Sequence, residues 1–187
     1  MRRLVLAFLL LAAPALAAGD PAAAVNDFYG VYTSQHAQGV GIPDATVRLR
    51  LQPVLSPRLN KELADAAFAQ ARLTAKVKNA VPPVLEGDIF SSLFEGASAW
   101  KVGACQTNAQ TNAQTGAKTA RCSVALSYAP PAAAGSKAKP ANWTDTVLLV
   151  NTPQGWKVDD VVYDAGFAFG NTGRLSEMLA MVIASNP

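Results

Sequence analysis

The sequence predicts an α+β fold, with N-terminal helices packed on a curved antiparallel sheet of about four strands and a closing C-terminal helix. Three observations lead to this fold class. Apolar residues recur at a helical spacing through the first half of the chain, alternate every second residue in much of the second half, and return to a helical spacing near the C-terminus. Helices followed by a run of antiparallel strands are typical of α+β domains.

The first helix is expected to begin at Asp20 and Pro21, because aspartate caps free backbone N–H groups and proline is tolerated at the first helical position. It is expected to end before Gly39, with His36 as its polar end. One apolar and aromatic face, at the i, i+3, i+4 and i+7 positions, is formed by Val25, Phe28, Tyr29 and Tyr32.

Two further helices are predicted before the sheet. The first covers residues 44–52 and is stopped by Pro53. The second covers residues 57–77, because Ser56 and the proline that follows repeat the cap-and-proline start. Residues 88–94 are predicted to form a short helical turn or a connector.

The second half of the chain is predicted to form two hairpins and a last helix. Residues 106–116 make the polar tip of the first hairpin, and residues 152–155 make the turn of the second. The four expected strands are residues 97–107, 118–129, 143–151 and 156–163. The apolar face of the closing helix consists of Leu175, Met178, Leu179 and Val182.

The two cysteines, Cys105 and Cys122, are expected to form a disulfide across the first hairpin. They are equidistant from the middle of the polar tip, and the cross-link would contribute about 3 kcal/mol by restricting the unfolded chain. Cross-strand partners must point to the same face of a sheet. Because Cys105 alternates with Gly103 whereas Cys122 alternates with Val124, we expect a bulge near Gly103.

Residues 1–18 have the three parts of a cleavable secretory signal peptide: an arginine pair, an apolar run over residues 4–13, and small residues before the cleavage point. The apolar stretch is shorter than the ~20 residues that cross a bilayer, and no other segment is long and apolar enough to span one. We therefore expect residues 19–187 to form one mature, cone-like domain that is periplasmic or secreted.

The composition disfavours several function classes. Two of the 16 lysines and arginines leave with the signal peptide, so 14 remain against 13 acidic residues. No cluster of basic residues with interleaved aromatics is present, which disfavours nucleic-acid binding. Because His36 is the single histidine, neither a Ser-His-Asp triad nor a histidine-rich metal site can be built, and no metal or cofactor is expected.

Four short motifs are distinctive: residues 27–32 (DFYGVY), residues 55–59 (LSPRL), Asp88 and residues 155–161 (GWKVDDV). Together they resemble a bacterial group of small periplasmic proteins and lipoproteins of unknown function. The resemblance implies a fold similar to that of nuclear transport factor two, in which helices wrap a cone of curved sheet, and it implies no established catalytic residues. This chain differs from the group in lacking a lipid-bearing cysteine and in having a long polar hairpin tip.

Cone folds of this kind often enclose a pocket, and some of them are isomerases or dehydratases that set a base such as aspartate against a donor such as tyrosine. The candidate bases are Asp88 and Asp160, and the candidate donors are Tyr29, Tyr32 and Tyr163. All of these candidates except Tyr163 also have a structural alternative. The first two tyrosines fit a core-facing stripe, and Asp88 fits a cap for the turn that follows it. Asp160 fits either an inward position or an exposed sheet edge.

Residues 163–172 interleave aromatics with glycines between the last strand and the last helix. The segment either lines a pocket mouth or a partner surface, or lets Phe167 and Phe169 plug the open end of the cone. We favour the plug, because large aromatic side chains are usually buried. Phe167 and Trp100 complete the set of candidate pocket or interaction residues.

The leading functional hypothesis is a non-enzymatic periplasmic binding or protein-interaction domain, because no convergent catalytic set accompanies the expected concave sheet. Its expected partner is a small apolar ligand or an envelope protein. One alternative is an isomerase-like, dehydratase-like or hydrolase-like enzyme that uses an Asp–Tyr pocket on a small molecule. Another is an inhibitor or immunity-type protein that acts through the polar hairpin tip.

Overall fold

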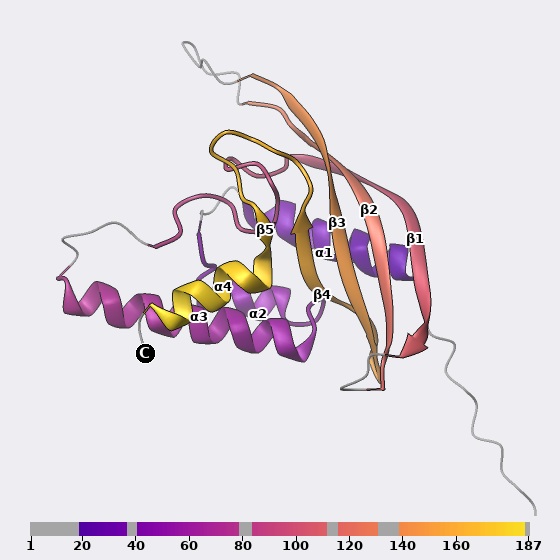
Figure 1. Ribbon diagram of the computed structural model, residues 1–187, viewed down its shortest axis with the longest axis horizontal. Helices are drawn as coiled ribbons and strands as arrows, with labels where there is room; N and C mark the ends of the chain where they lie inside the picture. Colours follow the sequence, from indigo (N-terminus) through magenta and orange to yellow (C-terminus); the bar gives the residue numbers. More distant parts are fainter. Residues whose placement is uncertain (1–18, 37–40, 79–83, 112–115, 131–138, 186–187) are drawn as a thin grey trace, which may run out of the picture.

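The computed structural model describes residues 19–36, 41–78, 84–111, 116–130 and 139–185. Within them, four helices accompany one five-stranded antiparallel sheet of order β1-β2-β3-β4-β5 (Figure 1). The helices are α1 (Pro21–His36), α2 (Ala45–Leu51), α3 (Pro57–Lys76) and α4 (Leu175–Ala184). The strands are β1 (Ala99–Thr111), β2 (Lys118–Tyr128), β3 (Ala141–Thr152), β4 (Gly155–Tyr163) and β5 (Gly173–Arg174). The predicted α+β class is confirmed, and the expected signal peptide lies outside the described residues.

The helices lie on one side of a curved sheet (Figure 1). Helix α1 contacts β1, β2 and β4, whereas α4 lies on α3 and β4. Buried and exposed residues alternate along β2, with Cys122, Val124 and Leu126 buried and the residues between them exposed. The predicted period of two in this strand is therefore confirmed, and it separates the core side of the sheet from the opposite side.

The helix starts follow from local capping chemistry. Asp44 accepts a hydrogen bond from Val47 N at 2.9 Å, and the Ser56 hydroxyl accepts one from Leu59 N at 3.0 Å. The predicted stripe of α1 is fully or nearly fully buried: Val25, Phe28, Tyr29 and Tyr32. The same holds for the predicted face of α4: Leu175, Met178, Leu179 and Val182. Local sequence signals thus position these helices correctly.

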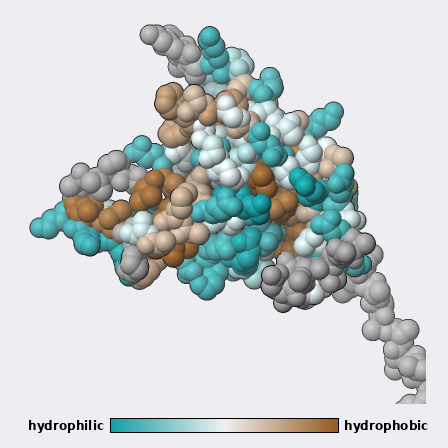
Figure 2. Space-filling view, in the orientation of Figure 1, coloured by the Kyte–Doolittle hydropathy of each residue, from teal (hydrophilic) through white to brown (hydrophobic). Residues whose placement is uncertain are grey.

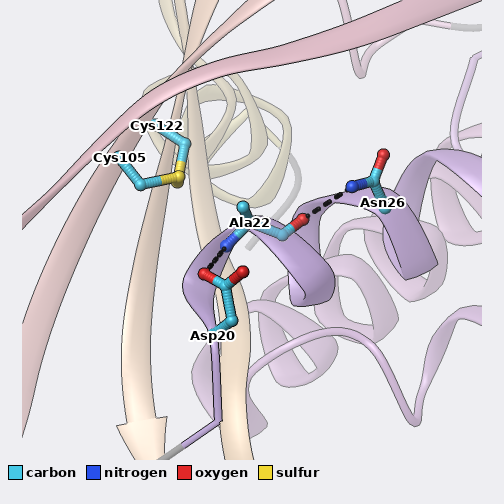
Figure 3. Close-up of a disulfide and its surroundings, with 5 residues drawn as sticks. All are labelled: Asp20, Ala22, Asn26, Cys105 and Cys122. Atoms are coloured by element: carbon cyan, nitrogen blue, oxygen red, sulfur yellow. Dashed lines mark hydrogen bonds between the residues drawn. A yellow bond between two sulfur atoms is a disulfide. The ribbon is translucent and has the colours of Figure 1, made fainter.

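The predicted disulfide between Cys105 and Cys122 is present, and the two residues are cross-strand partners in β1 and β2. Figure 3 draws it together with the start of α1, where Asp20 accepts a hydrogen bond from the backbone of Ala22. The register shifts by one residue between Val102 and Cys105, so the expected bulge is also confirmed. A disulfide is typical of proteins that mature outside the reducing cytosol.

Strand β1 continues four residues beyond its predicted end, to Thr111, which pairs with Lys118. The predicted tip over residues 106–116 was therefore too long. Its polar residues pair through the backbone, and the side chains of residues 106–108 are exposed, so their polarity does not oppose strand formation.

The outer edge of β4 is covered by two short pairings. Leu55 bridges Val158 near the start of the strand, and β5 pairs with Val162 and Tyr163 at its end. Between them, the β3–β4 register shifts so that Asp160 pairs with Leu148. This shift marks the place where α4 meets the sheet.

Among the described residues, no helix combines the length and the apolar character needed to cross a membrane.

Candidate functional site

The predicted aromatic residues of α1 lie in the core rather than around an open pocket. Phe28, Tyr29 and Tyr32 contact one another, and Phe90 joins them from the segment before β1. Trp100 stacks on Tyr29 with ring centroids 6.1 Å apart. Tyr29 and Tyr32 therefore lie in a core-facing stripe, as their structural alternative expects. Trp100 is the partly buried outer member of the cluster.

Asp88 and Tyr32 form the Asp–Tyr pair that the enzyme hypothesis requires. The Tyr32 hydroxyl accepts a hydrogen bond from Ala97 N at 2.8 Å. Burial raises the pKa of Tyr32, and the negative charge of Asp88 and a hydrogen bond with its carboxylate raise it further. The pair is buried, and Tyr32 stays a neutral phenol at physiological pH.

The segment around Asp88 is a connector without a helix. Asp88 accepts a hydrogen bond from Phe90 N at 2.8 Å, two residues on, and its own N–H donates to Phe94 O. Of the two predicted alternatives for residues 88–94, the connector is confirmed and the helical turn is not. The short side chain of Asp88 closes a local turn instead of capping a helix, a common alternative for aspartate.

Tyr163 and Tyr29 lie deeper in the same region. The Tyr163 hydroxyl donates to Ile89 O at 2.7 Å. Burial and then nearby carboxylates, Asp88 among them, raise the pKa of Tyr163. Burial and then the charges of Asp145 and Asp88 raise that of Tyr29. The Tyr29 hydroxyl is buried and has no hydrogen-bond partner among the described residues.

Asp160 points inward, which is one of its two predicted alternatives, and it contacts the start of α4. Its carboxylate accepts hydrogen bonds from Ser176 N at 3.0 Å and from the Ser176 hydroxyl at 2.6 Å. The residue that precedes α4, Arg174, makes no side-chain cap. Asp160 of β4 therefore caps α4. The cap comes from outside the helix, so the local sequence of α4 does not reveal it.

A third buried carboxylate, Asp145 on β3, joins three distant segments. It is 0 % exposed and accepts hydrogen bonds from Ser92 N at 2.8 Å, Trp143 Nε1 at 2.9 Å and Asp164 N at 3.2 Å. The Ser92 hydroxyl donates to it as well. Because both carboxylate oxygens are saturated with donors, Asp145 fixes the segment before β1 to the loop that follows β4.

Asn171 makes the second connection between these two segments. Its side-chain amide donates to Asp88 O at 2.6 Å and to Ser91 O at 2.7 Å, and its backbone N–H donates to Ser92 O at 2.9 Å. Gly170 makes this approach possible, because a Cβ there would lie 2.3 Å from Ser92 O. The base of the loop is therefore held on several sides.

The outer part of this loop is exposed and aromatic, and we call residues 167–170 the aromatic tip. Gly170 N donates to Phe167 O at 3.2 Å, so the tip is a tight turn. Phe167 is partly buried edge-to-face on Trp143, with ring centroids 5.7 Å apart. Phe169 is 89 % exposed. The favoured prediction of a plug is thus wrong for Phe169, because its side chain extends away from the core.

Figure 2 shows an apolar patch over the loop between β4 and β5, which is the raised yellow loop of Figure 1. Large exposed apolar residues elsewhere include Phe68 on α3, which is 65 % exposed, with the guanidinium of Arg72 over its ring at 5.1 Å. Exposure alone therefore does not distinguish Phe169. What distinguishes it is its place on a turn whose base is fixed by Asp145 and Asn171.

Three surface grooves formed by described residues lie elsewhere. One of about 620 Å³ runs between α2 and α3 and includes Arg48 and Gln70. Grooves of about 650 Å³ and about 530 Å³ include Trp156 and Lys157, respectively. None of these grooves is lined by the predicted candidates Tyr29, Tyr32, Asp88, Trp100, Asp160, Tyr163 and Phe167. Across the described parts of the chain, no group of three or more His, Cys, Asp or Glu side chains is placed to hold a metal ion.

Sequence reasoning missed Asp145 and Asn171. A signal for Asp145 was present, because Trp143, Asp145 and Val147 alternate and so place a carboxylate on an apolar strand face. A buried aspartate requires donors, and this would have marked the position. No comparable local pattern marks Asn171, whose acceptors lie about 80 residues away in the chain.

Comparisons with known proteins do not assign the chain to a family. No protein-family model matches the sequence, and no curated protein matches it. Among solved structures, a phospholipid-binding protein from Ralstonia solanacearum aligns with 90 % of this chain and 76 % of that one at 14 % identity. The TM-score is 0.28, too low to establish a common fold, so the alignment supports no functional inference. The family resemblance stays a prediction.

Proposed function

We propose that residues 19–187 form a non-enzymatic binding domain that contacts its partner through the aromatic tip. One observation carries the proposal: Phe169 is 89 % exposed on a turn whose base is fixed by buried and partly buried hydrogen bonds. Exposed aromatic side chains are favoured anchors in protein interfaces. A loop that is already ordered also loses little conformational entropy on binding, which favours affinity.

The proposal includes the compartment. The disulfide between Cys105 and Cys122 supports a location outside the cytosol, and the signal-peptide pattern at residues 1–18 agrees with export. We place the mature domain in the periplasm or the secreted fraction. N-terminal sequencing of the protein purified from its host tests this placement, because it must begin close to Gly19.

The enzyme alternative has one observation in its favour, the contact between Asp88 and Tyr32. A base and a donor at this position would need access to substrate, yet both residues are buried and neither lines the grooves described above. We therefore favour binding over catalysis. The inhibitor alternative depends on the polar hairpin tip, part of which lies outside the described residues, and it stays a prediction.

A photo-cross-linking experiment tests the proposed contact. The full chain is expressed in its native host with benzoyl-phenylalanine at position 169 and, as a matched control, at position 68, which is also an exposed phenylalanine. Cells are irradiated intact, and adducts are separated and identified by mass spectrometry. We expect a discrete adduct from position 169 and none from position 68.

Two outcomes contradict the proposal. Absence of an adduct at position 169 would show that the aromatic tip has no partner in the cell. Equal adducts from positions 169 and 68 would show only non-selective labelling of exposed aromatic positions.

A further inference from the structure

The two segments joined by Asp145 and Asn171 share an unusual charge pattern. Residues 84–98 contain three acidic residues and residues 163–173 contain one, and neither segment contains a lysine or an arginine. Glu86 in the first segment and Asp164 in the second are exposed. The chain as a whole is slightly basic, so this local excess of negative charge does not follow from its overall composition.

The nearest cation in sequence, Arg174, does not neutralise this region. Its guanidinium lies 3.9 Å from Asp160 and 3.6 Å from Glu177, at the start of α4. The aromatic tip is therefore carried by two segments whose exposed charges are negative. Such a surface repels anionic membranes and nucleic acids and attracts lysine and arginine side chains.

The shape of the aromatic tip also restricts its partner. Binding sites for small molecules are concave and surround most of the ligand. The aromatic tip is instead a turn that presents Phe169 outward, so the concave surface must belong to the partner. A pocket that receives a phenylalanine ring and has basic residues at its rim is a feature of a protein surface.

We infer that the partner of the aromatic tip is a polypeptide surface that combines an apolar pocket with lysine or arginine at its rim. This inference rests on the proposed function and names its partner class. Phe169 supplies the apolar anchor, and Glu86 and Asp164 supply charge complementarity at the rim, where ion pairs act mainly on specificity and association rate.

The test uses a fluorescein-labelled peptide of three Lys-Leu-Leu-Lys repeats, which presents both features, and the same peptide with glutamate in place of lysine. Binding to the full mature chain is followed by fluorescence anisotropy. We expect the lysine peptide to bind and the glutamate peptide not to bind. Phe169→Ser should weaken binding about tenfold or more. The combined change Glu86→Gln and Asp164→Asn should weaken it about threefold to fivefold and reduce its salt dependence.

Matched variants control for the overall properties of the surface. Phe68→Ser removes another exposed phenylalanine, and Asp27→Asn removes an exposed carboxylate outside the two segments. Both should leave peptide affinity within twofold of the unmodified chain. Vesicles of phosphatidylcholine, with and without phosphatidylglycerol, complete the set, and we expect neither to bind.

The inference is overturned if the glutamate peptide binds as well as the lysine peptide, if Phe169→Ser leaves binding unchanged, or if vesicles bind through Phe169. A lipid or acidic-protein adduct from position 169 in the cross-linking experiment would likewise overturn it while leaving the proposed function intact. If position 169 gives no adduct at all, the proposed function itself fails.

Discussion

The base and the tip of the loop that follows β4 differ sharply in burial. At the base, Asp145 is fully buried and its carboxylate accepts hydrogen bonds from three segments. Phe169, five residues beyond Asp164 in the loop that follows β4, is almost entirely exposed. The difference teaches that an exposed side chain need not belong to a loosely held loop. Here Phe169 is exposed, yet polar contacts fix the backbone on both sides of the aromatic tip.

The largest expected effect comes from removing the carboxylate at the base. Asp145→Ala leaves the donors of Ser92, Trp143 and Asp164 buried without an acceptor, and each such group costs about 1–3 kcal/mol. We expect the free energy of unfolding, measured by urea denaturation, to fall by about 4 kcal/mol or more. Asp65→Ala, which removes a partly exposed ion pair with Lys61, should change it by less than about 1 kcal/mol. A comparably small loss in Asp145→Ala would remove the distinction between base and tip.

The three buried tyrosines near the base predict sensitivity of the protein's stability to alkaline pH. The pKa values of Tyr29, Tyr32 and Tyr163 are raised by burial, so they ionise near pH 10 in the unfolded chain but not in the folded one. The stability they contribute is therefore present below pH 10 and is lost as the pH rises above it. Three such groups should lower the free energy of unfolding by about 3 kcal/mol between pH 10 and 11.

Urea denaturation at pH 8, 10 and 11 measures this dependence. Tyr163→Phe removes one ionisable group and should reduce the alkaline loss by about a third, whatever its effect on stability at pH 8. An unchanged slope in that variant would mean that Tyr163 is accessible to water in the folded protein.

Asp160 offers a milder test, because it fixes one helix rather than two loops. Asp160→Ala removes the acceptor for Ser176 N and the Ser176 hydroxyl, and loss of a helix cap costs about 1–2 kcal/mol. Hydrogen exchange should accelerate mainly in the first turn of α4 and leave the aromatic tip protected. Acceleration spread equally over both regions would show that Asp145 and Asp160 belong to one cooperative unit.

The smallest effect on stability is expected at the tip. Phe169→Ser removes a side chain with little buried surface, so the free energy of unfolding should change by less than about 0.5 kcal/mol. Phe68→Ser, at a similarly exposed site, should behave alike in the same denaturation assay. A loss above 1 kcal/mol in Phe169→Ser alone would support the plug that the sequence favoured.

Several elements could be predicted because their causes are close together in the chain. Ser56 caps α3 through a hydrogen bond to Leu59, three residues away, and the stripe from Val25 to Tyr32 is a matter of helical spacing. The bulge at Val102 and Cys105 followed from comparing two strand patterns that a single hairpin brings together. The candidate site was predicted less well, because Asp88 and Asp160 were recognised as polar residues whose partners could not be named.

The sequence by itself determined where most helices and strands begin, which of their faces are buried, and which cysteines pair, because these properties depend on spacing and on nearby residues. Only the tertiary structure decided that Asp145 binds the backbone of Ser92, 53 residues earlier, and that Phe169 faces solvent. The physical reason is that the hydrophobicity of a side chain sets the free energy that it gains from burial. Whether a buried position exists for that side chain depends on how distant segments pack.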